Sequence, residues 1–262
     1  MGEQTLLAAV TARGIATLTL NRPDKGNCYD APMLAALHAH FAACGKDAAV
    51  RAIVLRGAGK HFCVGAEISR PGQPRNDEGG ASSGPSLIDV LLELDRVPKP
   101  TIALVQGACV GGGLAFACCC DIVIASSHAF FSIPEVRIGI PPSALIPFFV
   151  RAMGDRGLRR YGLSGERFSA AEALRMGIAQ QVCEPGGIEA ALAEVIEGIL
   201  LSAPGAVRES KQAAARFAAQ PIPVERLQQM ERSFKDVLDS DEAREGRASF
   251  VEKRKPRWYP PS

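Results

Sequence analysis

Short apolar runs and helical spacings alternate along the first half of this chain. A hairpin of two short strands is predicted between Val10 and Leu20, where Arg13 and Gly14 break the apolar pattern. Three further runs are brief, apolar and continuous, as expected of strands buried on both faces. These runs are Ala52 to Leu55, Thr101 to Val105 and Ile122 to Ala125, the first two ended by Arg56-Gly57 and Gln106-Gly107.

Helical spacing is clearest after Asp30, which is expected to cap a helix that has Pro32 in its first turn and runs to about Lys46. Further helices are predicted at Leu114 to Cys120, Ala170 to Met176, Ile188 to Leu201 and Ala206 to Ala219, the last three ending at or before Gly177, Pro204 and Pro221. Strands that alternate with helices imply right-handed crossovers and a mainly parallel sheet. The pattern therefore predicts an α/β fold with a mostly helical C-terminal third.

One segment shows neither the apolar runs of a strand nor the spacing of a helix. Between Pro71 and Pro85 the sequence PGQPRNDEGGASSGP lacks apolar anchors, so we expect a mobile loop. The chain contains no internal repeat and no linker that would separate two independent domains.

Composition narrows the function. A chain of 262 residues with 47% hydrophobic and 22% charged residues can bury one large core. The net charge of +2 and the lack of a basic, aromatic-interleaved stripe argue against nucleic-acid binding. No run reaches the roughly 18 apolar residues of a membrane span, and the N-terminus lacks a leader pattern. We therefore expect a cytoplasmic protein, and a small or phosphorylated metabolite stays open as its ligand.

The eight cysteines do not have metal-ligand spacing. Cys118, Cys119 and Cys120 are consecutive, so on a helix they point in different directions and cannot share one tetrahedral ion. We expect reduced thiols that pack as small hydrophobic side chains, and no metal site.

Two glycine-rich turns follow the predicted strands, HFCVGAEI after the first run and VQGACVGGGLAFACCCD after the second. Ligands bind at the carboxyl ends of parallel strands, and glycine lets backbone N–H groups approach an anion closely. The triplet Gly111, Gly112 and Gly113 is equally compatible with close packing of a helix on the sheet. It matches neither a dinucleotide fingerprint nor a phosphate loop.

Six ordered segments resemble the successive signatures of the enoyl-CoA hydratase/isomerase (crotonase) family, from about Ile15 to Arg257. They are LNRPDKGN, GKHFCVGAEI, KPTIALVQGACVGGGLAFACCCDIVIAS, FSIPEVRIGI, LSGERFSAAEALRMGIAQQV and EGRASFVEKRKP. The resemblance implies a spiral of ββα repeats with the acyl-CoA site in residues 1–200, and a helical oligomerisation region in residues 201–262. It also implies a homotrimer or a hexamer made of two trimers, with coenzyme A entering as part of the substrate and no separate cofactor.

The family's catalytic positions fall on three residues here. The resemblance makes the backbone N–H groups of Ala66 and Gly112 an oxyanion hole, which would stabilise the enolate formed at the thioester oxygen. It makes Glu135 the general base or acid, and we expect Phe131, Ile133 and Ile140 to raise the pKa of its carboxyl by burying it.

The sequence departs from common hydratases at Ala115, where they carry a second glutamate. A single carboxylate can move a proton between the α and γ carbons, so this departure favours a Δ3,Δ2-enoyl-CoA isomerase. The runs FSIPEVRIGIPPSALIPFFVRAMG and RRYGLSGERF instead resemble a bacterial subgroup associated with methylglutaconyl-CoA or isohexenylglutaconyl-CoA hydration, whose members can also lack that glutamate. Hydration by a lyase is the first expectation, isomerisation the second, and a non-catalytic acyl-CoA-binding protein the third.

The substrate-binding residues implied by the resemblance lie in three segments. Near the nucleotide and along the same channel they are Lys25, Gly26, Ala66, Glu67 and Ile68, with Gly112 at the thioester. Phe250 and Lys253 are three positions apart, so on one helix face they would offer an aromatic ring and a cation to a phosphate. A solvated basic helix end at Lys253, Arg254 and Lys255 explains the same charges equally well.

Overall fold

The computed structural model describes residues 4–67, 84–218 and 240–261, without the side chains of Phe250 and Val251. The predicted loop between Pro71 and Pro85 lies almost wholly outside the described residues, and so does Ile68.

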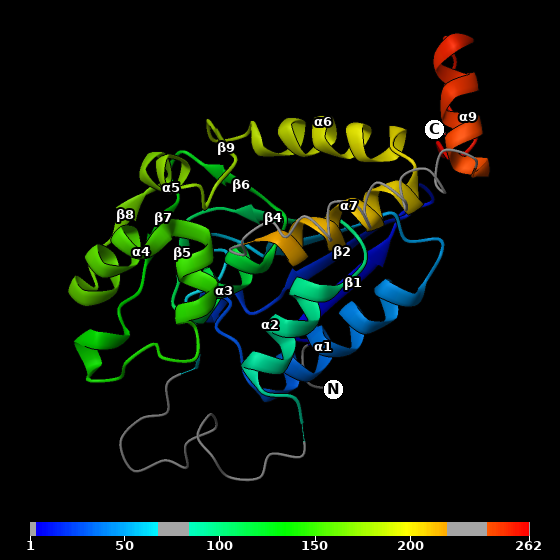
Figure 1. Ribbon diagram of the computed structural model, residues 1–262. Coiled ribbons are helices and arrows are strands. Elements are labelled where there is room, and N and C mark those ends of the chain that lie inside the picture. The colour runs from blue at the N-terminus through cyan, green and yellow to red at the C-terminus, as the bar shows by residue number, and fades with distance from the viewer. Residues whose placement is uncertain (1–3, 68–83, 219–239, 262) are drawn as a thin grey trace.

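A six-stranded sheet forms the centre of the molecule, in the order β1-β2-β3-β4-β6-β9 (Figure 1). Only β1 and β2 run antiparallel, and every other neighbouring pair is parallel, as predicted. The hairpin is also confirmed, although its first strand begins well before Val10. The strands are β1 (Leu6–Val10), β2 (Ile15–Leu20), β3 (Ala52–Gly57), β4 (Thr101–Val105), β6 (Ile122–Ser126) and β9 (Gln181–Cys183).

The helices mostly follow the predicted ranges. They are α1 (Ala31–Lys46), α2 (Leu87–Arg96), α3 (Gly112–Cys119), α4 (Ile146–Ser164), α5 (Ala170–Met176), α6 (Ile188–Leu201), α7 (Pro204–Phe217) and α9 (Asp241–Val251). Asp30 caps α1 as expected, since its Oδ1 accepts a hydrogen bond from the Met33 amide at 2.9 Å. The predicted start of α7 was two residues late, because Pro204 fits the first turn.

Helix α2 was not predicted from the sequence. Its start carries a capping box, in which the Ser86 hydroxyl accepts from the Asp89 amide and the Asp89 carboxylate accepts from the Ser86 amide. Within the described residues, no single helix is both long and apolar enough to cross a membrane, and only α6 with α7, bent by 107°, reach that length and composition together.

Each face of the sheet is buried against a different set of helices (Figure 1). Alternate strand residues point to opposite faces, so Ala52 and Val54 of β3 pack with α6, whereas Ile53 and Leu55 pack with α1, α2 and α3. Both faces of β3 and β4 are therefore apolar, which explains why these strands appear in the sequence as continuous runs.

A second, smaller sheet extends beyond the carboxyl end of β4. It contains β5 (Ala108–Val110), β7 (Phe130–Ser132) and β8 (Phe168–Ser169), in that order. Chain segments from distant parts of the sequence meet there, because the backbone of Cys63 pairs with that of Cys109 in β5, and helix α3 begins just after β5.

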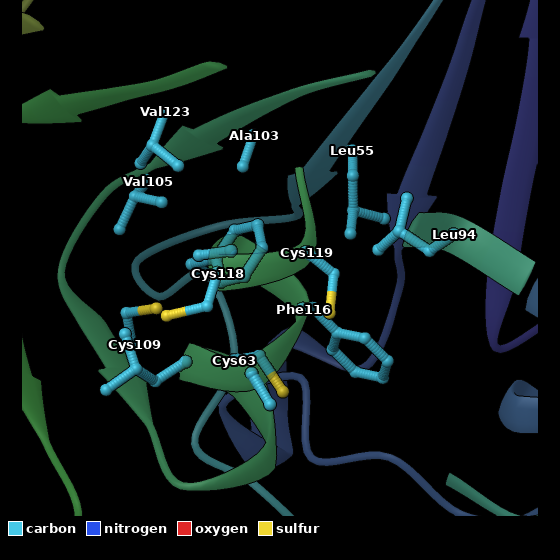
Figure 2. Packing of buried hydrophobic residues seen from close by; sticks show 14 of the residues in the cluster. Leu55, Cys63, Leu94, Ala103, Val105, Cys109, Phe116, Cys118, Cys119 and Val123 are labelled. Carbon is cyan, nitrogen blue, oxygen red and sulfur yellow. The ribbon is translucent and has the colours of Figure 1, made fainter. Parts of the chain in front are cut away.

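The eight cysteines are free thiols, and six of them are buried. Figure 2 shows four of these, Cys63, Cys109, Cys118 and Cys119, within the apolar cluster around α3. Burial raises the pKa of the Cys63 thiol to about 12, which keeps it protonated. The prediction that they pack as small hydrophobic side chains is confirmed. No group of three metal-ligating side chains occurs among the described residues.

Candidate active site

Ala66 pairs with Tyr29 in an isolated parallel β-bridge, which sets the direction of the Ala66 amide. The Tyr29 amide donates to the Gly65 carbonyl at 2.9 Å, and the Glu67 amide donates to the Tyr29 carbonyl at 3.0 Å. This parallel pairing uses the groups on either side of Ala66, so the N–H of Ala66 points to the opposite side. No hydrogen-bond acceptor for that N–H occurs among the described residues.

The glycine triplet supplies a second amide of the same kind. Gly111 has a φ of 56°, a left-handed value that favours glycine, and its amide donates to the Ser132 carbonyl at 2.9 Å. Gly112 then opens helix α3, where first-turn amides have no partner within the helix. The two turns lie close together, because a β-carbon on Gly65 would lie 3.9 Å from the Gly112 nitrogen.

Glu135 lies against the glycine triplet. It opens the short 3-10 helix η2 (Glu135–Ile138), and a β-carbon on Gly111 would lie only 2.5 Å from its Oε1. Its Oε2 is buried and has no hydrogen-bond partner within the described part of the chain. Burial therefore raises the pKa of the Glu135 carboxyl above its ordinary value.

The expected walls around Glu135 are only partly present. Phe131 and Ile133 are fully buried, whereas Ile140 is 42% exposed and so offers less apolar cover than expected. The difference arises because Gly139 ends η2 in a left-handed conformation and Ile140 leads away toward the start of α4.

Ala115 lies one helical turn after Gly111, since its amide donates to the Gly111 carbonyl at 3.1 Å. Ala115 therefore lies in the first turn of α3, one turn from the glycine against which Oε1 of Glu135 rests. Ala115 is completely buried. A longer side chain there would displace core atoms or enter the space beside Glu135.

Lys25 and Glu67 are joined by an ion pair that the sequence did not reveal. Nζ of Lys25 lies 2.6 Å from Oε1 of Glu67, while Arg22 reaches Oε2 of Glu67 at 2.8 Å and Asp30 at 3.1 Å. Hydrogen bonds from Lys25 and then Arg22 lower the pKa of the Glu67 carboxyl, which stays ionised at neutral pH. The network fixes the segment that carries Ala66, and it makes Arg22 a residue that sequence reasoning missed.

Asn27 is a second residue that sequence reasoning missed. It is fully buried with a φ of 58°, and its Oδ1 accepts from the Arg22 amide at 2.9 Å. Its Nδ2 donates to the carbonyls of Ala58 and His61, at 2.8 and 2.6 Å. These bonds hold the segment with Lys25 and Gly26 against the turn that leads to Ala66, but burial of an asparagine in a polar loop has no sequence signal.

The structure thus gathers most of the expected residues through direct contacts. Lys25 forms an ion pair with Glu67. Gly26 packs against Val64, since a β-carbon on Gly26 would lie 2.8 Å from the Val64 side chain, and Ala66 follows Val64 in the same turn. Gly112 and Glu135 complete the group through the contacts above.

The C-terminal residues are placed differently. Helix α9 ends at Val251, so Lys253 lies beyond it, in a left-handed turn with a φ of 52°. The expectation that Phe250 and Lys253 share a helix face is therefore wrong, because the helix ends between them. The side chain of Phe250 lies outside the described residues, and α9 is at the end of the sheet away from β5 and β7 (Figure 1).

A cavity of about 780 Å³ lies at the opposite, amino-terminal edge of β3 and β4. Two of its cations already bind backbone carbonyls: Arg51 donates to those of Ser202 and Trp258, and Lys99 donates to those of Asp47 and Val50. Neither the glycine turns nor Glu135 lines this cavity.

Comparison with known proteins decides the family. Residues 11–260 match the family described as enoyl-CoA hydratase/isomerase. The chain belongs to this family, that of the crotonases. It is 32% identical to a mevalonyl-coenzyme A hydratase of Aspergillus fumigatus, over 98% of this chain and 96% of that protein.

Other relatives agree with this membership. A short-chain-enoyl-CoA hydratase of Clostridium acetobutylicum is 33% identical, over 92% of each chain. The crystal structure of an enoyl-CoA hydratase/isomerase from Marinobacter aquaeolei is 32% identical with a TM-score of 0.87, covering 97% of this chain and 99% of that one. The crotonase fold and a place among acyl-CoA hydratases and isomerases follow for this chain.

Proposed function

We propose that this crotonase catalyses the reversible hydration of a 2-enoyl-CoA thioester. The observation that carries the proposal is the close approach of the two turns that contain Ala66 and Gly112, next to the buried carboxyl of Glu135. Two preorganised donors would stabilise negative charge on the thioester oxygen, and each such donor is worth on the order of 3 kcal/mol.

The proposed reaction uses one carboxylate twice. Glu135 removes a proton from water as the water oxygen bonds to the β-carbon, and the double-bond electrons move to the thioester oxygen as an enolate. The enolate then collapses, and Glu135 returns the proton to the α-carbon. The raised pKa of Glu135 suits both steps, because it brings the carboxyl closer to the pH at which it must accept and release a proton.

Isomerisation of a 3-enoyl-CoA to a 2-enoyl-CoA is the second candidate. Ala115 favours it, because a second carboxylate is missing from the buried position that common hydratases use. In this reaction Glu135 would take a proton from the α-carbon and deliver it to the γ-carbon through the same enolate. A non-catalytic acyl-CoA-binding protein is the third candidate, disfavoured by the retained Glu135 and glycine triplet.

A turnover screen with mass-spectrometric product identification separates these candidates. It would offer straight, branched and carboxylated 2-enoyl-CoA esters together with a 3-enoyl-CoA. We expect faster hydration of a branched or carboxylated ester than of a straight-chain one, with the substrate's own carboxylate taking the role left open by Ala115. Equal rates on straight-chain esters would contradict this substrate class. Tight CoA binding without any turnover would support the non-catalytic alternative.

Installing a glutamate at Ala115 tests whether the site lacks only a second carboxylate. We expect Ala115→Glu to leave hydration of straight-chain 2-enoyl-CoA low, because the pocket is shaped for another substrate. A rise of about 10-fold or more would instead show that water is already positioned there. An unpartnered buried carboxylate costs several kcal/mol, so Ala115→Gln, measured with a thermal melt, serves as the control for folding.

The remaining assignments are also proposals. We propose that Lys25, Gly26 and Glu67 line the channel for the CoA moiety, and that the protein assembles as a trimer or a pair of trimers. Exposed apolar side chains on η2 and α4 support assembly, since such surfaces commonly pack against other subunits. These are Ile138 on η2 and Ile146, Val150 and Leu163 on α4, with Ile140 between the two elements.

A further inference from the structure

Tyr29 contacts both of the turns that carry the proposed oxyanion-hole amides. Its backbone amide and carbonyl bind Gly65 and Glu67, at 2.9 and 3.0 Å, on either side of Ala66. Its side chain is only 9% exposed and lies over Gly112. Tyr29 therefore connects the turn that contains Ala66 to the start of helix α3.

The contact with Gly112 is made by the far end of the ring. A β-carbon on Gly112 would overlap the hydroxyl oxygen of Tyr29 and lie 2.7 and 2.8 Å from its Cε1 and Cζ. The ring also packs edge-on against Phe116, with 5.7 Å between the ring centroids and 75° between the planes. Gly112 and Phe116 are four positions apart, so the ring lies along a single face of the first turn of α3.

We propose that Tyr29 is a positioning residue, which acts as a rigid spacer that sets the separation of the Ala66 and Gly112 amides. The inference rests on the proposed function, because the spacing matters only where both amides bind one oxygen. Hydrogen bonds to a developing charge are effective only when the donors are already in place, and a misplacement of about 1 Å can lower turnover about 100-fold. We assign this role to the ring, whose Cε1 and Cζ lie against Gly112.

Three substitutions separate the effects on kcat of the Tyr29 ring, of its hydroxyl and of a general loss of stability. Tyr29→Leu keeps the inner part of the side chain but lacks the atoms that touch Gly112, so kcat should fall about 10- to 100-fold with KM changed less than about 3-fold. Tyr29→Phe keeps Cε1 and Cζ and should restore kcat to within about 3-fold of wild type. Leu37→Ala removes a fully buried side chain of the same core from the middle of α1 and should lower stability while leaving kcat unchanged.

A second readout measures the oxyanion site without turnover. Acetoacetyl-CoA forms an enolate whose ultraviolet absorption reports how strongly the bound protein stabilises that charge. Wild type and Tyr29→Phe should show the enolate signal, and Tyr29→Leu should bind the ester with the signal reduced.

The outcomes distinguish the two proposals. A folded Tyr29→Leu protein with wild-type kcat and enolate signal would overturn the positioning role, and so would equal losses in Tyr29→Leu and Tyr29→Phe. If wild type itself neither turns over any enoyl-CoA nor stabilises the enolate, the proposed function has failed instead. If Tyr29→Leu does not fold, Tyr29→Met is used under the same criteria.

Discussion

Replacing Glu135 with glutamine is expected to lower turnover by roughly 100-fold or more and to raise the melting temperature at neutral pH. Glutamine keeps the shape of the side chain but cannot accept a proton. Steady-state kinetics on the best ester of the screen would measure the first effect, and a thermal melt would measure the second. Glu194→Gln is the matched control, since Glu194 is exposed on α6, and it should change neither quantity.

The sign of the stability effect follows from the raised pKa of Glu135. Between the unfolded pKa and the higher folded pKa, the folded protein binds more protons than the unfolded chain, so stability falls as pH rises through this window. Above the window the folded protein holds an ionised carboxylate with a buried, unpartnered Oε2, and glutamine removes that charge. Near-normal turnover in Glu135→Gln, or a lower melting temperature, would contradict the assignment.

Gly112→Pro is expected to reduce turnover at least about 100-fold while the protein still folds. Proline removes the N–H that we assign to the thioester oxygen, and it suits the first position of a helix such as α3. Its ring would also press on Tyr29, because any β-carbon at position 112 overlaps that side chain.

Two further variants separate the effect of losing the Gly112 N–H from the effect of adding side-chain atoms at position 112. Gly112→Ala retains the N–H but adds the β-carbon, so it should lose less activity than Gly112→Pro, with the difference measuring the donor. Gly198→Ala is the control, since a β-carbon there meets nothing within 4 Å, and it should leave the kinetics intact. Unchanged kinetics in folded Gly112→Pro would place the oxyanion site elsewhere.

The sequence predicts those parts of the fold in which local signals and burial agree. Helix α1 has both its Asp30 cap and its apolar spacing, and β4 is a run of five buried residues with both ends marked. Helix α2 lies outside the predicted elements because its Ser86 capping box directly follows a polar, glycine-rich stretch typical of a loop. Strands β5, β7 and β8 have only two or three residues each, too few to show an alternation.

The candidate site depends on contacts between distant segments, which local patterns do not contain. Glu135 is an ordinary glutamate after a proline in the sequence, and its burial arises from the return of η2 to Gly111. Resemblance to a family supplied that position, whereas nothing in the sequence pointed to the ring of Tyr29 above Gly112 or to the pairing of Arg22 with Glu67. Lys253 was misplaced because the basic run continues past the end of α9.

The most direct test of the central claim is the product formed from a 2-enoyl-CoA ester in heavy-oxygen water, identified by mass spectrometry. The account predicts that wild type yields a 3-hydroxyacyl-CoA with one heavy oxygen on the β-carbon, formed at least about 100 times faster than by Glu135→Gln. The claim of hydration would be contradicted if folded wild-type protein gave no labelled product from any straight, branched or carboxylated ester.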